Sequence, residues 1–378
     1  MKLRQVLNKL GRGNGGKAPL PRDAYFLLVD KCNARCAMCQ DDYFRHTGNA
    51  ITLDKFKIIA ANLRLQDMKS AVLAGGDPLL NRDLLEIISF INGLNPNINV
   101  VICTNAIALT PNTSEGLLQR NVYSLSVSVN AATGATYQKV AQVDCFDRVI
   151  ANVKHYLELL HKLGKPLRMN LSFVATRKNI EELPEFIKLA ASLGIKDVSS
   201  TYCRFFPIER RLSLAANEDN LLQDSDSLYF HQALSDKYFK EADDLARQLG
   251  INFTREPLFS EMAPKHNCQF PFNGIMVGFD GEVFPCCGGE VIFKDKVTSG
   301  VYDFSNVLKQ PIEAFWWGES YQALRHSALH PDNPAVPECG ACSAILSWKG
   351  NIEAAHIMAW DDLKGKSIDF GLSGSRKR

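Results

Sequence analysis

From residue 23 to about residue 250, short apolar runs alternate with longer amphipathic stretches, and few folds accommodate that alternation. The apolar runs, which we expect to form strands, cover residues 24–30, 71–74, 99–103, 122–129, 168–175 and 197–204. The amphipathic stretches, which we expect to form helices, cover residues 52–65, 82–92, 114–120, 149–163, 180–193 and 229–249. Strand–helix units in series imply a parallel sheet with right-handed crossovers. The sequence therefore predicts an α/β fold.

The composition of the chain changes after about residue 251. Helical periodicity fades there, and Gly, Pro, Cys and aromatic residues become more frequent. A chain of 378 residues is long enough for one large domain and a smaller one. We therefore expect an N-terminal extension over residues 1–22, the α/β domain over 23–250, a small loop-rich domain over 251–360 and a tail over 361–378.

Charge and hydropathy exclude several classes of protein. A formal net charge of +2 gives no general electrostatic case for binding nucleic acid. No apolar run approaches the roughly 20 residues of a membrane span, and the first residues contain no apolar core of a secretory signal. Eleven cysteines are an odd number and do not suit a disulfide scaffold. We expect a cytoplasmic protein, in which grouped cysteines indicate metal or redox sites.

The first group of cysteines follows the first predicted strand directly. Cys32, Cys36 and Cys39 have the spacing Cys-x3-Cys-x2-Cys. Three thiolates on so short a loop can face one centre. Iron–sulfur clusters are normally held by four cysteines, so three local ligands leave one iron open, just as catalytic zinc sites keep an open position. A zinc knuckle and buried structural thiols are the alternatives.

This loop resembles the signature of the radical SAM superfamily, with Met38 where relatives usually carry an aromatic residue. The resemblance implies a partial (β/α)6 TIM-like barrel, with chemistry at the carboxyl ends of its strands. It also implies that Cys32, Cys36 and Cys39 hold a [4Fe–4S] cluster whose remaining iron binds S-adenosylmethionine. The reduced cluster then cleaves the sulfonium to methionine and a 5′-deoxyadenosyl radical.

Motifs after later strands extend the resemblance. Gly75, Gly76, Asp77 and Pro78 correspond to the family's Gly-Gly-Glu-Pro, which holds the methionine amino group; a plain turn is the alternative. Thr104 and Asn105 begin a partial match to Thr-Asn-Gly, with capping as the alternative. Ser126, Ser128 and Asn130 alternate, so they point to one side of their strand. Ser128 and Asn130 occupy places in the family's Ser-x-Asp-Gly, which implies contact with S-adenosylmethionine; mutual hydrogen bonding is the alternative.

Two further positions are candidates on the fifth and sixth predicted strands. Arg168 alternates with Asn170 and Ser172, and we include Arg168 among the cofactor contacts. Cys203 is a candidate catalytic thiol that could donate a hydrogen atom to a substrate radical. A small buried apolar side chain is the alternative for Cys203.

A second group of cysteines lies near the C-terminal end. A hairpin with an Asp-Gly turn is expected at residues 279–283, and it could bring two cysteines to one centre. The group resembles the SPASM/twitch extension of radical SAM enzymes. Because no cysteine follows the last of them, the count favours one auxiliary [4Fe–4S] cluster, with Cys287 as a possible substitute ligand; a structural zinc site is the alternative. The expected ligands are Cys268, Cys286, Cys339 and Cys342.

The resemblance implies an enzyme that abstracts hydrogen from a substrate C–H bond, with oxidation, epimerisation or cross-linking as the outcome. The implied partners are a small-molecule or peptide substrate and an electron donor of the flavodoxin or ferredoxin type. About twenty residues precede the first predicted strand, so we expect no N-terminal peptide-recognition domain. A zinc-stabilised, non-catalytic binding protein is the alternative function.

Overall fold

The computed structural model describes residues 18–39, 48–203, 222, 224–261, 268, 270–286, 300–330 and 333–340. Its strands form one sheet in the order β7-β6-β5-β4-β3-β2-β1-β8-β9. Neighbouring strands are parallel except for β8 and β9, which are antiparallel. The α/β fold with a parallel sheet is therefore confirmed. The strands are β1 (Asp23–Leu27), β2 (Ser70–Ala74), β3 (Asn99–Thr104), β4 (Ser124–Ser128), β5 (Met169–Ala175), β6 (Asp197–Tyr202), β7 (Asn252–Arg255), β8 (Gly274–Val277) and β9 (Val283–Phe284).

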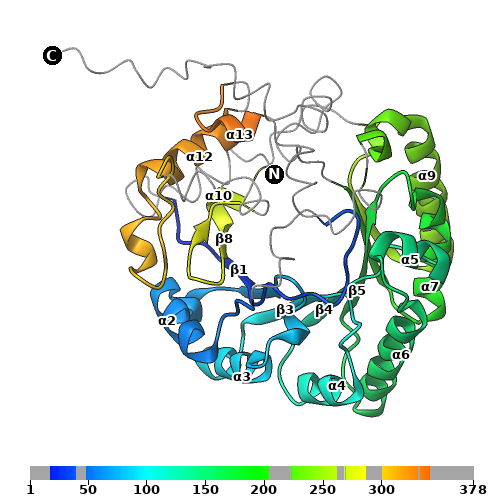
Figure 1. The fold of residues 1–378 in the computed structure, drawn as a ribbon, viewed down its shortest axis with the longest axis horizontal. Coiled ribbons are helices and arrows are strands. Elements are labelled where there is room, and N and C mark those ends of the chain that lie inside the picture. The colour runs from blue at the N-terminus through cyan, green and yellow to red at the C-terminus, as the bar shows by residue number, and fades with distance from the viewer. Residues whose placement is uncertain are drawn as a thin grey trace.

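The sheet is curved but not closed, so the fold is a partial TIM-like barrel (Figure 1). Helices cover its outer, convex side. The helices of this layer are α2 (Leu53–Leu63), α3 (Leu84–Leu94), α4 (Pro111–Leu118), α5 (Gly134–Ala141), α6 (Phe146–Lys162), α7 (Leu183–Ser192) and α9 (Gln232–Leu249). Short 3-10 turns are η2 (Leu65–Asp67), η3 (Pro78–Leu80), η4 (Ile180–Glu182), η6 (Asp224–Asp226), η7 (Leu228–His231) and η8 (Ile312–Ala314).

Strand periodicity explains which side chains face the helices. In β3, Val100 and Ile102 are buried against the outer layer, whereas Val101 and Cys103 are partly exposed on the inner side. The inner face therefore carries every second residue of each strand. The buried alternate residues and the apolar faces of the helices form one large core.

The C-terminal elements join the barrel instead of standing apart from it. Here β8 pairs with β1 in parallel, and β8 and β9 form the expected hairpin, whose Gly281 has a φ of +76°. The helices of this part are α10 (Phe270–Asn273), α12 (Glu319–Leu329) and α13 (Pro337–Gly340). The indole N–H groups of Trp316 and Trp317 donate to the carbonyl oxygens of Pro19 and Ala18 at 2.8 and 2.7 Å. This end of the chain therefore packs on the segment that enters β1.

Candidate active site

The cysteine loop leaves the carboxyl end of β1 and is held first by the turn after β2. The N–H groups of Gly76 and Asp77 donate to the carbonyl oxygens of Val29 and Lys31 at 2.7 and 2.9 Å. A Cβ on Gly75 would lie 2.7 Å from the Val29 oxygen, and one on Gly76 would lie 2.6 Å from the Lys31 carbonyl carbon. Gly75 also has a φ of +118°. The two glycines thus allow a backbone contact that no other residue permits.

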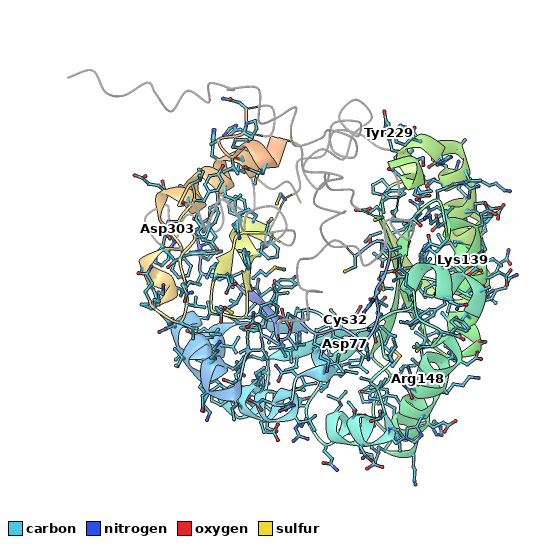
Figure 2. All side chains as sticks on the ribbon, in the orientation of Figure 1. Cys32, Asp77, Lys139, Arg148, Tyr229 and Asp303 are labelled. Carbon is cyan, nitrogen blue, oxygen red and sulfur yellow. The ribbon has the colours of Figure 1, made fainter. Side chains whose placement is uncertain are left out.

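Asp77 is fully buried and joins the turn after β2 to the turn after β3. Its carboxylate accepts hydrogen bonds from the Thr104 hydroxyl at 2.8 Å and from the Asn105 N–H at 2.9 Å. Figure 2 places Asp77 and Cys32 near each other on the inner side of the sheet. Burial raises the pKa of Asp77 to about 6 despite these hydrogen bonds. Asp77 therefore organises the residues that contact the cysteine loop.

Lowering the pH from about 7 to about 5 should stabilise the iron-free chain through Asp77 by about 1 kcal/mol. The pKa of this carboxyl is about 6 in the folded chain, above its ordinary value of 3.8. The folded state therefore binds the proton first, and the stability gained below pH 6 is lost as pH rises through that value. Urea unfolding at both pH values measures the effect, and Asp77→Asn should lack it. Equal pH dependence in the two chains would contradict the prediction.

Asn105, which follows β3, links this strand to the first cysteine through hydrogen bonds of its side chain. Its side-chain N–H group donates to Asn33 Oδ1 at 2.8 Å and to Cys32 Sγ at 3.5 Å. Its side-chain oxygen accepts from the Ile107 N–H at 2.9 Å, which fixes the orientation of the amide. Asn105 therefore positions the Cys32 sulfur. Its proposed contact with S-adenosylmethionine stays a prediction.

Helix α5 (Gly134–Ala141), which was not predicted from the sequence, holds the other half of the cysteine loop. The N–H groups of Arg35 and Ala37 donate to the carbonyl oxygens of Ala141 and Val140, at the C-terminal end of α5, at 3.0 and 2.8 Å. The signal that could have located the helix is Thr133, whose hydroxyl caps it by accepting from Thr136 N–H. The cysteine loop is thus supported by three separate segments.

The thiols themselves suit an iron–sulfur cluster. Burial raises the pKa of Cys32 to about 11, and burial together with the neighbouring Cys32 raises the pKa of Cys36 to about 12. Two thiolates side by side in such surroundings need a positive counter-charge, which iron supplies. Within the described ranges, no three His, Cys, Asp or Glu side chains lie close enough to hold a single metal ion. Cysteine thiolates are the donors that iron–sulfur clusters use.

The polar residues on the inner face hydrogen-bond to one another. The hydroxyls of Ser128 and Ser172 lie 3.0 Å apart, and Asn170 Nδ2 donates to Ser126 Oγ at 3.3 Å and to Ser199 Oγ at 2.9 Å. Each of these side chains is partly exposed toward the inner side. They form an uncharged polar wall across β4, β5 and β6.

Asn130 follows β4 in a left-handed conformation, with a φ of +61°. Its side-chain oxygen accepts from the Val174 N–H at 2.7 Å, and its own carbonyl oxygen accepts from Asn179 Nδ2 at 3.0 Å. The Asn130 side chain therefore ties the end of β4 to β5. This arrangement accounts for its burial, and contact of Ser126, Ser128 and Asn130 with the cofactor stays a prediction.

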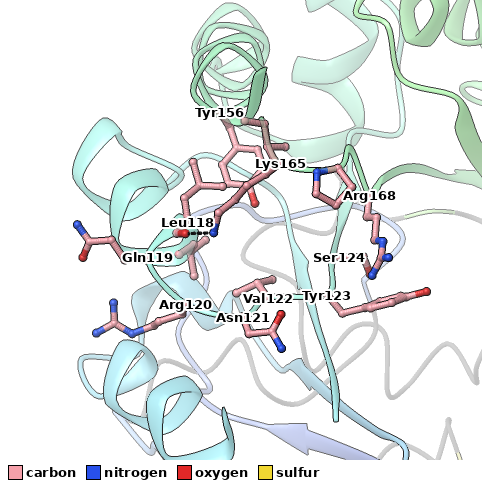
Figure 3. Close-up of a pocket in the computed structure, with 13 residues that line it drawn as sticks. Leu118, Gln119, Arg120, Asn121, Val122, Tyr123, Ser124, Tyr156, Lys165 and Arg168 are labelled. Atoms are coloured by element: carbon pink, nitrogen blue, oxygen red, sulfur yellow. Dashed lines mark hydrogen bonds between the residues drawn. The ribbon is translucent and has the colours of Figure 1, made fainter. Parts of the chain in front are cut away.

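Arg168 does not join the other candidates. It precedes β5, at the amino ends of the strands, whereas the cysteine loop follows the carboxyl end of β1. There it is exposed, and its guanidinium stacks 4.4 Å from the Tyr123 ring centre. It lines a pocket of about 430 Å³ between α4, α6 and the start of β4, where Lys165 donates to the Leu118 carbonyl (Figure 3). Alternation along the strand predicted that Arg168 and Asn170 share a face of the sheet. It did not predict that Arg168 lies at the amino end of the strand, away from the cysteine loop.

Cys203 lies just after β6 and is buried. It packs in a small apolar cluster with Ala37 and Leu222, against Met38. Cys203 is therefore a neighbour of the cysteine loop. Its role as a hydrogen-atom donor stays a prediction.

Three of the four expected auxiliary ligands lie in the described part of the chain: Cys268 precedes α10, Cys286 follows β9 and Cys339 lies on α13. Helices α10 and α13 both contact α12. Cys342 and Cys287 lie outside the described residues. The Tyr321 hydroxyl and Arg325 Nη2, both on α12, are buried and have no hydrogen-bond partner among the described residues. Buried unsatisfied donors beside thiols fit an anionic iron–sulfur cluster.

Comparisons with known proteins agree with this arrangement. Residues 26–190 match the Radical SAM superfamily, and residues 268–343 match SPASM, an iron–sulfur cluster-binding domain. A probable GTP 3′,8-cyclase of Saccharolobus islandicus is 28% identical over 176 residues, which are 47% of this chain and 55% of that protein. This chain thus spans about half the length of that relative. An AdoMet-dependent heme synthase of Methanosarcina barkeri is 25% identical over 336 residues, 85% of this chain and 88% of that protein.

Solved structures share the fold. Streptococcus suis SuiB, bound to the precursor peptide SuiA, superposes with a TM-score of 0.63 and 17% identity, over 85% of this chain and 70% of that one. The protein anSMEcpe, with bound AdoMet and Cp18Cys peptide, superposes with a TM-score of 0.55 and 16% identity, over 80% and 82% of the two chains. No helix in the part of the chain that the structure describes has the length and apolar character needed to cross a membrane.

A radical SAM domain implies a [4Fe–4S] cluster with S-adenosylmethionine, and a SPASM domain implies auxiliary iron–sulfur clusters. The cysteine loop, its glycine turn and the C-terminal cysteines occupy the matched segments. This chain therefore contains a radical SAM domain over residues 26–190 and a SPASM iron–sulfur domain over residues 268–343.

Proposed function

We propose that this chain is an oxidoreductase or maturase that acts on a C–H bond of a small molecule or peptide, giving oxidation, epimerisation or cross-linking. Cys32, Cys36 and Cys39 would hold the catalytic cluster, and Cys268, Cys286, Cys339 and Cys342 a single auxiliary cluster. When bound, the catalytic cluster and S-adenosylmethionine supply reductive cleavage and a 5′-deoxyadenosyl radical that abstracts hydrogen. The observation that carries the proposal is the cysteine loop held by three segments at the carboxyl ends of the strands.

The protein's own contribution to this chemistry is to hold the thiols in place. Backbone hydrogen bonds to Gly76, Asp77 and α5 fix both halves of the cysteine loop. The side chain of Asn105 orients the Cys32 sulfur. A site whose ligands are fixed in advance loses little freedom when its cofactor and substrate bind. The carbonyl groups of the glycine turn are the candidates for receiving the methionine ammonium group.

The polar wall supports an uncharged polar substrate. Ser126, Ser128, Asn170, Ser172 and Ser199 carry hydroxyl and amide groups, which both donate and accept hydrogen bonds. Peptide amides and the hydroxyls of a small molecule both match such a wall. Peptides are bound in the solved structures of SuiB and anSMEcpe, whereas the heme synthase and the GTP cyclase are named for small molecules.

Reduction of the catalytic cluster requires a low-potential electron donor, for which we propose a cytoplasmic flavodoxin or ferredoxin. The test of the whole proposal begins with anaerobic purification and metal analysis. Two four-iron clusters require about eight irons and eight sulfides per chain. With S-adenosylmethionine and dithionite, the chain should release 5′-deoxyadenosine and methionine in equal amounts. Colourless protein that contains zinc and releases neither product would instead support a zinc-stabilised binding protein.

A further inference from the structure

Helix α12 carries two buried polar groups with no hydrogen-bond partner in the part of the chain that the structure describes. Among the described residues, the buried side-chain atoms without a hydrogen bond include Tyr321 Oη and Arg325 Nη2. The two residues are one helical turn apart, so they lie on the same face of α12. Tyr321 is fully buried, and Arg325 is only 8% exposed. Buried donors normally have a hydrogen-bond acceptor, so we look for one in the space between this face of α12 and the elements packed against it.

Arg325 has contacts that hold it in place, but none of those with described residues neutralises its charge. Its Nε–H donates to the Pro271 carbonyl oxygen at 3.0 Å, and its guanidinium lies 4.5 Å from the Trp316 ring centre and 5.3 Å from that of Tyr321. No carboxylate within the described ranges forms an ion pair with it. Burial lowers the pKa of Arg325 to about 10, which still leaves it charged at neutral pH. A buried cation of this kind is unfavourable unless an anion lies nearby.

Three of the expected auxiliary ligands lie on or next to elements that are linked to the same helix. Cys268 precedes α10, which holds Arg325 through Pro271. Cys286 follows β9, which pairs with β8, and β8 directly continues α10. Cys339 lies on α13, which is tied to α12 through the Val336 N–H bond to Ser327 Oγ at 2.8 Å. Figure 1 shows α10, α12 and α13 together on one side of the barrel opening.

We propose that Arg325 and Tyr321 donate N–H and O–H hydrogen bonds to an auxiliary iron–sulfur cluster bound at Cys268, Cys286 and Cys339, and that they raise its reduction potential. Thiolates and sulfides make such a cluster anionic, and reduction adds a further negative charge. A positive charge and hydrogen bonds beside the sulfurs stabilise the reduced form more than the oxidised form. The inference rests on the auxiliary cluster of the proposed function, and it makes Arg325 and Tyr321 positioning residues of that cluster.

The test uses the full chain with Cys32, Cys36 and Cys39 all replaced by alanine, so that only the auxiliary cluster remains. The chain is reconstituted with iron and sulfide, and the cluster is titrated with dithionite under electron paramagnetic resonance. Arg325→Met should lower the equilibrium constant for one-electron reduction about tenfold, which is a shift of about 59 mV to more negative potential. Arg325→Lys should keep most of the parent potential, and Tyr321→Phe should shift it in the same direction by less.

Arg255→Met is the matched control. Arg255 lies on β7, at the other end of the sheet, and is paired with Asp243 at 2.7 Å, so its loss should leave the potential unchanged. The inference is overturned if Arg325→Met binds iron like its parent and titrates at the parent potential. If Arg325→Met holds no iron, Tyr321→Phe decides, since an unshifted potential there overturns the inference as well. If the parent itself binds no iron, the auxiliary cluster of the proposed function fails and the inference fails with it.

Discussion

Replacing Cys36 with alanine is expected to reduce 5′-deoxyadenosine formation to background. Cys36 lies between two backbone bonds that fix the loop, from Arg35 and Ala37 to α5, so the loop should keep its shape while losing one of three cluster ligands. The iron content should fall from about eight to about four per chain, because one of two four-iron clusters is lost. Both quantities are measured on anaerobically purified protein with dithionite and S-adenosylmethionine.

Two other cysteines serve as controls for this substitution. Cys145 is partly buried and accepts a hydrogen bond from Arg148 Nη2 at 2.6 Å, and it is not a proposed ligand, so Cys145→Ala should keep both the iron and the product. Cys286→Ala should lose the auxiliary iron yet still release deoxyadenosine without turning over substrate. Deoxyadenosine production by Cys36→Ala would show that the loop does not hold the catalytic cluster.

Replacing Gly76 with alanine is expected to be nearly as damaging, although Gly76 contributes no side chain. The new Cβ would lie 2.6 Å from the Lys31 carbonyl carbon, and this neighbour is backbone that cannot rotate away. The cysteine loop must therefore shift. A displacement of about 1 Å near a reacting centre costs on the order of 10²-fold in rate. We expect a loss of that size in deoxyadenosine formation, with reduced iron loading.

Gly93→Ala is the matched control for this prediction. Gly93 lies within α3, and a Cβ there would meet nothing within 4 Å. The substitution should leave iron content and activity unchanged and should stabilise the chain by roughly 0.5–1 kcal/mol, since Gly loses more conformational freedom in a helix than Ala. Gly76→Ala protein with normal iron and normal activity would mean that the close backbone contact is dispensable.

Local patterns in the sequence predicted a large part of the barrel. Each of the six predicted strands overlaps one of β1 to β6, because alternation of buried and exposed residues is a property of a few consecutive positions. The cap of α2 was also predictable, since Thr52 accepts from the Lys55 N–H. The short strand β7 was missed, and β8 was expected only as an arm of the hairpin at residues 279–283, because four residues carry too little periodicity to recognise.

The separate motifs of the candidate site were predictable, but their arrangement was not. The cysteine spacing and the glycine turn each involve a few consecutive residues, so both were recognised from the sequence. The hydrogen-bond partner of each polar side chain, by contrast, lies on another strand and cannot be read from neighbouring residues. Asp77 accepts hydrogen bonds from Thr104, the last residue of β3, and from Asn105, the residue after it. The hydroxyl of Ser128 on β4 likewise lies next to that of Ser172 on β5. Arg168 shares its strand face with Asn170 yet lies at the opposite end from the cysteine loop.

The order of residues along the chain was enough to establish the strand–helix alternation, the two groups of cysteines and the turn that accompanies the first group. The assembled fold alone established that α5 supports the cysteine loop, that β8 pairs with β1 from about 250 residues away, and that Arg325 is buried without a carboxylate partner among the described residues. The physical reason is the range of the interactions. Periodicity, capping and ligand spacing act over a few residues, whereas burial and charge compensation depend on segments that meet only when the chain folds.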